Sequence, residues 1–362
     1  MNETAEEMNH INFLEGLNSK SQGAANRLLQ LSLFFLVCAC LTVFSMPQET
    51  SQAAQEQPSE PAPQDEGFRI GVSVDQVFLS VSARSTGGGF VNDLQPEDIL
   101  IFEDGILQKI ENFYSQQVPV KVVLLIDASG STTGAQSQIQ NAALEFVKRL
   151  GEEDQVAIIT FNHEIRQILD WTNDLDKVEM AMKRIYARGN TVLNDAIYVT
   201  FDDLLQSVDG KTAVIILTDG GDTGSTVSFG QAVDKAARSE SIVYIVSKLE
   251  EAWASAIAFR SNSANMARFG GITPRELTDE YMLEMRRNLK RLADMTGGRV
   301  LDTSSFNSIE DVYAQVAEEL KNQYYISYIS TNKRKDGKWR QIELRSRRLG
   351  TVLRTRQGYY AN

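Results

Sequence analysis

Apolar and polar residues alternate along residues 68–117, which is the pattern of half-buried β-strands. The pair Asp104-Gly105 stands between two apolar runs, as in a tight hairpin turn. Alternation returns in the last stretch, residues 324–362. Because each stretch alone has too few strands for an independently stable sheet, we expect the N- and C-terminal β segments to pack together as one accessory subdomain.

Between these segments, residues 118–323 consist of short apolar runs separated by helical patterns, which is typical of a parallel sheet with crossover helices. The expected strands are 120–127, 154–162, 211–219, 241–248 and 298–302. The expected helices are 136–151, 174–187, 193–208, 229–240, 274–295 and 308–323. The run EIRQILDW predicts an edge strand that follows the second strand through a tight hairpin. The fold class is therefore α/β, a doubly wound (Rossmann-like) domain with a mostly parallel central sheet.

An apolar stretch at residues 28–46 follows two basic residues, Lys20 and Arg27, and precedes an acidic segment. Basic residues on the N-terminal flank keep that side in the cytoplasm. We therefore interpret the stretch as a signal or anchor segment and residues 1–27 as a cytoplasmic leader. The main part of the chain is expected to be exported, to the periplasmic or cell-envelope side.

The fate of the apolar segment has three open alternatives. The letters VCAC before Leu41 allow lipoprotein-type cleavage, which would leave Cys40 lipidated. Cleavage near Ser45 and retention as a short membrane anchor are the others. Residues 47–67 are rich in Pro, Gln and Glu and too poor in apolar residues to form a core, so we expect a disordered linker.

Composition narrows the classes of partner. The chain has 362 residues, and its net charge of -12 argues against general nucleic-acid binding. Cationic residues nevertheless concentrate near the C-terminus, where strand alternation predicts a solvated outer face; contact with an anionic envelope polymer or an acidic partner is the alternative. They are Lys333, Arg334, Lys335, Lys338, Arg340, Arg345, Arg347, Arg348, Arg354 and Arg356.

The candidate ligand-binding residues lie in three loops that we expect at one edge of the sheet. Two of the loops follow the strands 120–127 and 211–219, and the third precedes the helix 193–208. In an open parallel sheet, ligands bind beyond the carboxyl ends of the strands. The oxygen-bearing side chains expected there are Asp127, Ser129, Ser131, Thr191 and Asp219. A set of oxygen ligands without His or Cys suits a hard cation, Mg²⁺ with Mn²⁺ or Ca²⁺ as substitutes. Since two acids leave such a site about neutral, the metal stays electrophilic toward a partner's carboxylate.

The motif DASGS after an apolar strand, the isolated Thr191 before a helix and LTDG after another strand resemble the metal-ion-dependent adhesion site of von Willebrand factor type A domains. The resemblance implies that Ser129, Ser131 and Thr191 bind the metal directly or nearly so. It also implies that Asp127 and Asp219 hold waters around the metal.

The resemblance extends to the flanking segments. LQPEDILIFEDGILQKIENF and DGKWRQIELRSRR resemble segments of the bacterial, acidobacterial-type VWFA-related family. Asp222 and Asp195 are weaker candidates, expected to support the metal ligands through hydrogen bonds. For the residues after the first strand, a helix cap is the alternative explanation, and for Asp222 it is a solvated turn.

The connection of residues 249–274 is longer than connections of this kind usually are. It follows the carboxyl end of a strand, so it is expected to border the metal edge. Its candidate partner-binding residues are Trp253, Phe259, Arg260, Arg268 and Phe269. An extra amphipathic helix packed on the domain is the alternative.

These observations predict a binding protein, not an enzyme. An aspartyl phosphotransferase would need an acid where Ser129 stands, and His163, the single histidine after the apolar segment, cannot support a catalytic triad. We expect an exported or membrane-tethered module that uses the metal to capture an Asp or Glu of a protein partner, in adhesion or envelope assembly. A structural module with a non-exchanging metal is the alternative, and a metal-dependent hydrolase is a third.

Overall fold

The computed structural model describes residues 76–115, 118–252, 254 and 279–361. They belong to one compact unit, Phe68–Asn362, while the other unit, Met1–Gly67, lies outside the described residues together with the predicted leader, anchor segment, Cys40 and linker. The predicted partner-binding residues of the 249–274 connection also lie outside them. No helix within the described ranges is long and apolar enough to cross a membrane.

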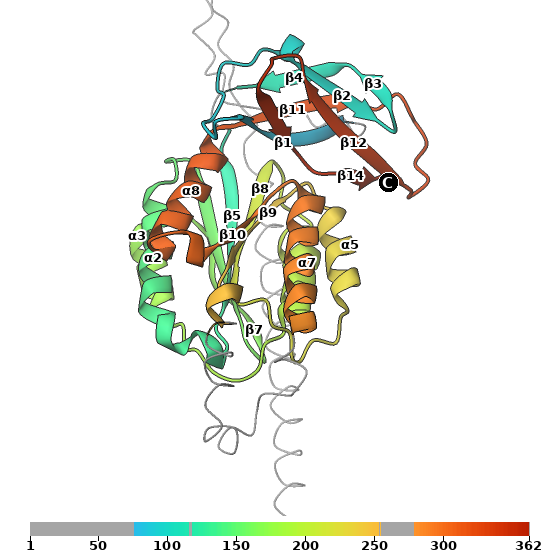
Figure 1. Ribbon diagram of the computed structural model, residues 1–362. Helices are drawn as coiled ribbons and strands as arrows, with labels where there is room; N and C mark the ends of the chain where they lie inside the picture. The colour runs from blue at the N-terminus through green and yellow to red at the C-terminus, as the bar shows by residue number, and fades with distance from the viewer. Residues whose placement is uncertain (1–75, 116–117, 253, 255–278, 362) are drawn as a thin grey trace, which may run out of the picture. The chain divides into compact units, whose positions relative to one another are not determined.

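A six-stranded sheet forms the centre of the α/β domain (Figure 1), in the order β10-β9-β8-β5-β6-β7. Its strands are β5 (Val120–Asp127), β6 (Gln155–Phe161), β7 (Ile165–Thr172), β8 (Lys211–Thr218), β9 (Ile242–Ser247) and β10 (Val300–Asp302). Every neighbouring pair is parallel except β6 and β7, which form the expected antiparallel hairpin at the edge. The predicted fold class is confirmed.

Helices cover both faces of this sheet. One core cluster joins it to α2 (Gln136–Lys148), α3 (Leu175–Met182) and α8 (Ile309–Lys321). The other joins it to α4 (Leu193–Val199), α5 (Phe229–Ala237) and α7 (Asp279–Thr296). In β5, Leu124 packs in the first cluster and Leu125 in the second, because successive side chains of a strand point to opposite faces. Burial on both faces explains why the strand is a continuous apolar run.

Several helices end before the sequence predicted. The expected helices 136–151 and 174–187 end at Lys148 and Met182. The expected helix 193–208 is α-helical only to Val199 and continues as a π-helical turn, Thr200–Leu204. The Thr200 hydroxyl donates to the Ala196 carbonyl at 2.7 Å, a side-chain bond that competes with the regular helix pattern.

Two four-stranded antiparallel sheets form the expected accessory subdomain. Their strands are β1 (Gln76–Ser85), β2 (Ile99–Glu103), β3 (Ile106–Gln108), β4 (Ile110–Tyr114), β11 (Gln323–Ile329), β12 (Trp339–Ser346), β13 (Thr351–Arg354) and β14 (Gly358–Tyr360). The sheet orders are β13-β1-β11-β4 and β14-β12-β2-β3. Leu79, Ile101 and Tyr328 belong to one core that both sheets share. At the β2–β3 hairpin, Asp104 and Gly105 have φ of 48° and 80°, as the predicted tight turn requires.

A buried polar cluster links this subdomain to the α/β domain. The carboxylate of Glu319 on α8 accepts hydrogen bonds from Arg84 of β1 at 2.8 Å and from Arg299 at 3.1 Å. The Tyr244 hydroxyl of β9 donates to the same carboxylate at 3.3 Å. Glu319 is 1% exposed. Its negative charge is therefore buried with two cations beside it.

Candidate metal centre

The centre begins where β5 ends, at Asp127. This side chain is 1% exposed. One carboxylate oxygen, Oδ1, accepts from the Ser129 amide at 2.9 Å, and the other, Oδ2, accepts from the Thr218 hydroxyl at 3.0 Å. A short 3₁₀ helix, Gly130–Ala135, then leads into α2. The carboxylate is thus held in one orientation at the carboxyl end of the central strand.

The two serines of the DASGS motif lie side by side after Asp127. Ser129 Oγ and Ser131 Oγ are 3.0 Å apart. Ser129 is buried and Ser131 is exposed, so the pair spans from the interior to the surface. Although Ser129 is the N-cap residue of the 3₁₀ helix, its side chain makes no capping hydrogen bond. The alternative explanation of Ser129 as a helix cap is therefore not supported.

Backbone hydrogen bonds join the three predicted loops. The Gly130 amide donates to the Gly189 carbonyl at 3.1 Å, which connects the first loop to the loop before α4. The Thr191 carbonyl of that second loop accepts a hydrogen bond from the Thr223 amide at 2.9 Å. Thr223 follows Asp219 in the third loop, so this bond connects the second and third loops. Thr218 and Asp127 connect the first and third loops directly. The structure thus brings the loops of Asp127, Thr191 and Asp219 to one edge of the sheet.

Asp219 follows β8 and is partly exposed. Its Oδ1 accepts from the Gly221 amide at 3.0 Å. The intervening Gly220 has φ of 85°, a left-handed conformation in which a Cβ would be strained, and a Cβ there would also lie 3.2 Å from Leu289 Cδ1. Glycine after the acid in LTDG is therefore a requirement of this turn.

The electrostatics of Asp127 are those of a carboxylate without a cation. Burial, and after it the negative charge of Asp219, raise its pKa to about 7, although hydrogen bonds from Ser129 and Thr218 oppose the shift. Within the described ranges, neither carboxylate takes part in an ion pair. A divalent cation between them would supply the missing positive charge.

Asp222 and Asp195 hold the loop that follows Asp219. Asp222 Oδ2 accepts from the Asn194 amide in the first turn of α4, at 2.8 Å, and from the Ser225 hydroxyl at 2.6 Å. Asp195 accepts from the Val227 amide at 2.7 Å. Asp222 is thus bonded to a helix start and does not lie in a simple solvated turn. Support of metal ligands by either residue stays a prediction.

Thr218 is the residue whose role sequence reasoning missed. Thr218 belongs to the LTDG motif, but the motif alone does not predict which group its hydroxyl contacts. Besides donating to Asp127, Thr218 Oγ1 accepts from the Gly220 amide at 3.0 Å. Its position at the end of an apolar strand could have predicted that Thr218 lies at the same edge of the sheet as Asp127. The hydrogen bond itself could not be predicted, because Asp127 is 91 residues away in the sequence.

The donor set fits a hard divalent cation. Its oxygens come from two carboxylates and from the hydroxyls of Ser129, Ser131 and Thr191, without nitrogen or sulfur. In the part of the chain that the structure describes, no three His, Cys, Asp or Glu side chains cluster as metal ligands. Hydroxyl groups would therefore have to complete the coordination. His163 is exposed in the β6–β7 turn. The hydroxyl of Ser129 lies 3.0 Å from that of Ser131, and the Ser129 side chain also hydrogen-bonds to the Asp127 carboxylate.

Comparison with known proteins identifies this part of the chain. Residues 122–221 match the von Willebrand factor type A domain family. A Synechocystis relative, "Uncharacterized protein sll0103", is 23% identical over 111 residues, which is 30% of this chain and 26% of the relative. The chain thus spans about a quarter of the length of this curated relative. Domains of this type are generally protein-interaction modules.

Solved structures with a similar arrangement come from several bacteria. The von Willebrand factor type A protein from Catenulispora acidiphila matches at TM-score 0.42 and 11% identity, covering 79% of this chain and 73% of that one. BatB from Bacteroides thetaiotaomicron matches at TM-score 0.38 and 16% identity, covering 56% and 97%. The PilB minor pilin from Streptococcus sanguinis matches at TM-score 0.40 and 11% identity, covering 57% and 62%. All three TM-scores are below 0.5.

Proposed function

We propose, since the chain contains a von Willebrand factor type A domain, that it is a metal-dependent protein-binding module. Ser129, Ser131 and Thr191 would hold Mg²⁺, with Mn²⁺ or Ca²⁺ as substitutes, while Asp127 and Asp219 would hold waters around it. When bound, the metal supplies an electrophile for an Asp or Glu carboxylate of the partner. Among the described observations, the buried carboxylate of Asp127 beside the partly exposed carboxylate of Asp219, with no described Lys or Arg paired to either, supports this proposal most.

The chain's own residues have separate tasks in this mechanism. Thr218 and the Ser129 amide orient the Asp127 carboxylate before any ion arrives, which lowers the entropy lost on binding. The exposed Ser131 marks the side of the centre that a partner can reach. Because the two carboxylates balance a divalent charge and the hydroxyls are neutral, an incoming carboxylate meets no net negative charge at the metal.

The proposed setting is outside the cytoplasmic membrane. The basic flank and apolar stretch of residues 28–46 support export, with either retention of this anchor or lipidation at Cys40. Partner capture by an exported module suits adhesion or envelope assembly. We propose no catalytic activity, since the single histidine after the apolar segment cannot support a catalytic triad.

The second candidate function is a structural metal that stiffens the three loops without exchanging a ligand. The backbone bonds among these loops support it, since they already form a connected unit. Under this alternative, metal removal lowers the unfolding temperature but changes no partner affinity. A metal-dependent hydrolase, the third alternative, would require turnover that disappears with the metal.

The deciding experiment is calorimetric titration of Mg²⁺ and Mn²⁺ into the full chain, with Asp219→Asn beside the parent protein. We expect saturable binding at one site in the parent and none in the variant. Asp209→Asn is the matched control, because Asp209 is an exposed acid in the connection before β8, at the opposite end of this strand from Asp219.

Heat of binding that persists unchanged in Asp219→Asn would contradict the proposed centre. An equal loss in Asp209→Asn would also contradict it, since the effect would then follow total charge and not position. Capture of Asp- or Glu-presenting peptides, with and without EDTA, separates the binding module from the structural alternative.

A further inference from the structure

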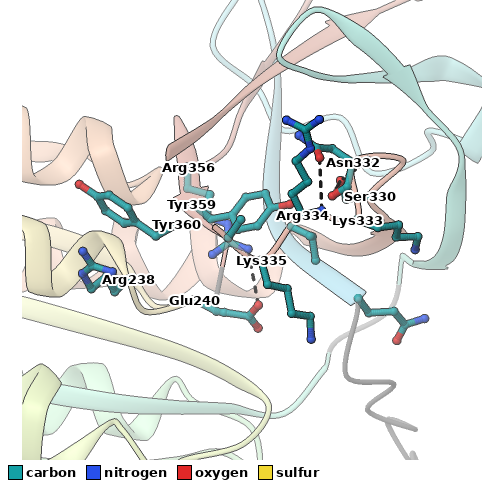
Figure 2. Close-up of a pocket in the computed structure, with 13 residues that line it drawn as sticks. Arg238, Glu240, Ser330, Asn332, Lys333, Arg334, Lys335, Arg356, Tyr359 and Tyr360 are labelled. Carbon is teal, nitrogen blue, oxygen red and sulfur yellow. Dashed lines mark hydrogen bonds and ion pairs between the residues drawn. The ribbon is translucent and has the colours of Figure 1, made fainter. Parts of the chain in front are cut away.

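A pocket lies between the accessory subdomain and the α/β domain, away from the candidate metal centre. The residues that line it come from β1, the connection between α5 and β9, the loop after β11 and the C-terminal strand β14 (Figure 2). Its volume is about 220 Å³. Glu240 in its wall precedes β9, whereas Asp219 follows β8, so the pocket is at the amino ends of the parallel strands and the metal centre is at their carboxyl ends.

The wall of this pocket is strongly cationic. Its described basic residues are Arg238, Lys333, Arg334, Lys335 and Arg356. One acid, Glu240, stands among them. The formal charge of the wall is therefore about four positive units, on a chain whose net charge is -12. A concentration of positive charge in a concave wall raises the local concentration of anions.

Arg356 is the buried member of this group. It is 7% exposed, so the prediction of a solvated outer face for the C-terminal cations is wrong here, as it is for Arg340 at 5%. The Arg356 Nη2 donates to the Phe78 carbonyl at 2.9 Å, and its contact with Glu240 is 3.5 Å long. Its buried Nε has no acceptor within the described part of the chain. The buried Arg356 guanidinium is thus held at the pocket by the Ser239 and Phe78 carbonyls and by Glu240.

Aromatic rings position two of the cations. The Arg238 guanidinium lies 4.0 Å from the centre of the Tyr360 ring, and that of Arg356 lies 5.5 Å from the centre of the Tyr359 ring. Both tyrosines line the pocket (Figure 2). Because these rings restrict the arginine side chains, less conformational entropy is lost when an anion binds. The loop residues Lys333, Arg334 and Lys335 are exposed at the rim.

We propose that this pocket binds a phosphate ester. The volume suits one small group, since pockets for drug-sized ligands measure about 300–1,000 Å³. A phosphate monoester has a charge of about -1.5 to -2 at neutral pH and three strong acceptor oxygens. The planar guanidinium matches this geometry with paired donors. A carboxylate has half that charge, so the phosphate ester satisfies the cationic wall better.

The test is calorimetric titration of the full chain with glycerol phosphate, glycerate and inorganic phosphate. We expect saturable binding of glycerol phosphate, at least about tenfold tighter than glycerate. The double variant Lys333→Gln/Lys335→Gln should weaken it about tenfold or more. Lys338→Gln is the matched control, because Lys338 is an exposed lysine near the same loop that does not line the pocket.

The variants change exposed side chains, so the fold is expected to persist, and the unfolding temperature of each should match that of the parent. No saturable binding of glycerol phosphate to the parent would overturn the proposal. Equal weakening by Lys338→Gln would overturn it as well, since the effect would then be one of overall charge. Equal affinity for inorganic phosphate would overturn the assignment to an ester. None of these outcomes depends on Mg²⁺, so all can be measured in EDTA.

Discussion

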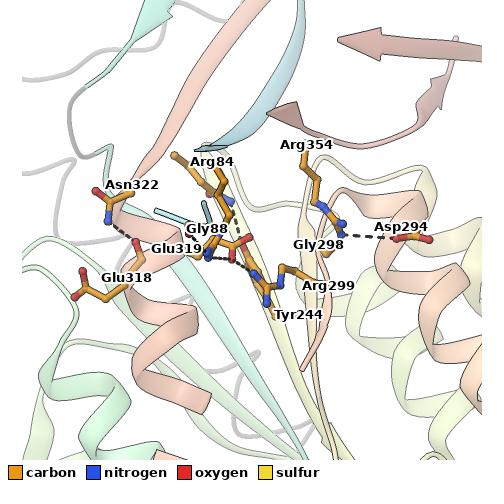
Figure 3. A network of polar contacts seen from close by, with 11 residues as sticks. Arg84, Gly88, Tyr244, Asp294, Gly298, Arg299, Glu318, Glu319, Asn322 and Arg354 are labelled. Atoms are coloured by element: carbon orange, nitrogen blue, oxygen red, sulfur yellow. Dashed lines mark hydrogen bonds and ion pairs between the residues drawn. The ribbon is translucent and has the colours of Figure 1, made fainter. Parts of the chain in front are cut away.

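Two carboxylates, Asp127 and Glu319, are both 1% exposed, but their surroundings are opposite. Glu319 lies between the guanidinium groups of Arg84 and Arg299 and also accepts from Tyr244 (Figure 3). Asp127 has neutral donors and a second negative charge, Asp219, nearby. The charge of Glu319 is balanced by two arginines of the protein. The charge of Asp127 has no such positive partner among the described residues.

The difference indicates which burial is structural and which is functional. A buried charge with its counter-charges in place contributes to the positioning of β1, β9 and α8. A buried charge beside a like charge lowers stability unless a cation binds. Since such an arrangement costs free energy in the folded protein, it supports the proposal of a ligand site at Asp127. The two sites therefore predict opposite responses to neutralisation.

The largest expected effect is that of neutralising the paired carboxylate. Glu319→Gln leaves Arg84 and Arg299 without their shared acceptor, and we expect the free energy of unfolding to fall by about 3 kcal/mol. Urea denaturation measures this change. Glu318→Gln is the control, because Glu318 is the exposed neighbour on the same helix, and its substitution should have little effect. A similar loss in both variants would show that the polar cluster does not stabilise the fold.

The second prediction is that neutralising Asp127, unlike neutralising Glu319, does not lower the free energy of unfolding. Mg²⁺ at a hundred times its dissociation constant should raise the parent's free energy of unfolding by about 2.7 kcal/mol. Asp127→Asn should abolish this increase and, in EDTA, should be at least as stable as the parent, because it removes the repulsion with Asp219. Thermal unfolding with and without Mg²⁺ measures both. If Asp127→Asn were clearly less stable than the parent in EDTA, the Asp127 charge would stabilise the fold as the Glu319 charge does, and the predicted difference between the two carboxylates would be wrong.

Lys211 is a buried positive charge, and it tests whether burial without a paired opposite charge also destabilises the charged form of a cation. Its Nζ donates to the Leu320 carbonyl at 2.7 Å, and burial lowers its pKa to about 8, although Asp154 opposes the shift. Between pH 8 and the ordinary lysine pKa of about 10.4, the unfolded chain holds this proton more often than the folded one, so stability rises with pH.

The measurement compares the parent with Lys211→Met at two pH values. From pH about 7.5 to about 9.5, the stability of the parent relative to the variant should increase by about 1–2 kcal/mol. Lys121→Met is the matched control for loss of a lysine side chain from the sheet, because Lys121 lies on the neighbouring strand β5 and pairs with Thr212. A relative stability that stays flat across this range would show that Lys211 is not desolvated.

The smallest expected effect concerns the hydrogen bond that orients Asp127. Thr218→Val removes the hydroxyl that donates to Oδ2, and we expect Mg²⁺ affinity to fall about tenfold, as for other residues that orient metal-binding groups. Thr212→Val is matched in residue type, burial and strand, but its hydroxyl bonds to Ser241 at the other end of β8. Calorimetry should show unchanged Mg²⁺ affinity in the Thr212 variant. Equal effects would assign the loss to general destabilisation.

Much of the α/β domain was predictable from the sequence. Each of its strands is either a continuous apolar run or a strand reached by a tight hairpin, and these local patterns need no knowledge of distant contacts. Four of the five predicted metal-site residues follow the same logic, because residues after parallel strands share one edge; the fifth, Thr191, precedes a helix. Their loops do meet at that edge.

Other features were not predictable because they depend on contacts between distant segments. Sequence alternation indicated strands at both ends of the chain but not that β1 pairs with β11 and β13 and does not pair with β2. The same alternation placed Arg356 on a solvated face, since it shows which residues share a face but not what covers that face. A π-helical turn after Val199 also escaped prediction.

The sequence by itself determined where the α/β domain's strands and helices lie, though not where every helix ends, and the order of oxygen-bearing residues along three loops, because hydrophobic periodicity and turn chemistry are local. Only the tertiary structure decided which buried charge has a partner. Burial makes a charge expensive in either case, and the sign of its nearest neighbours in space, which the sequence does not state, separates the paired Glu319 from Asp127.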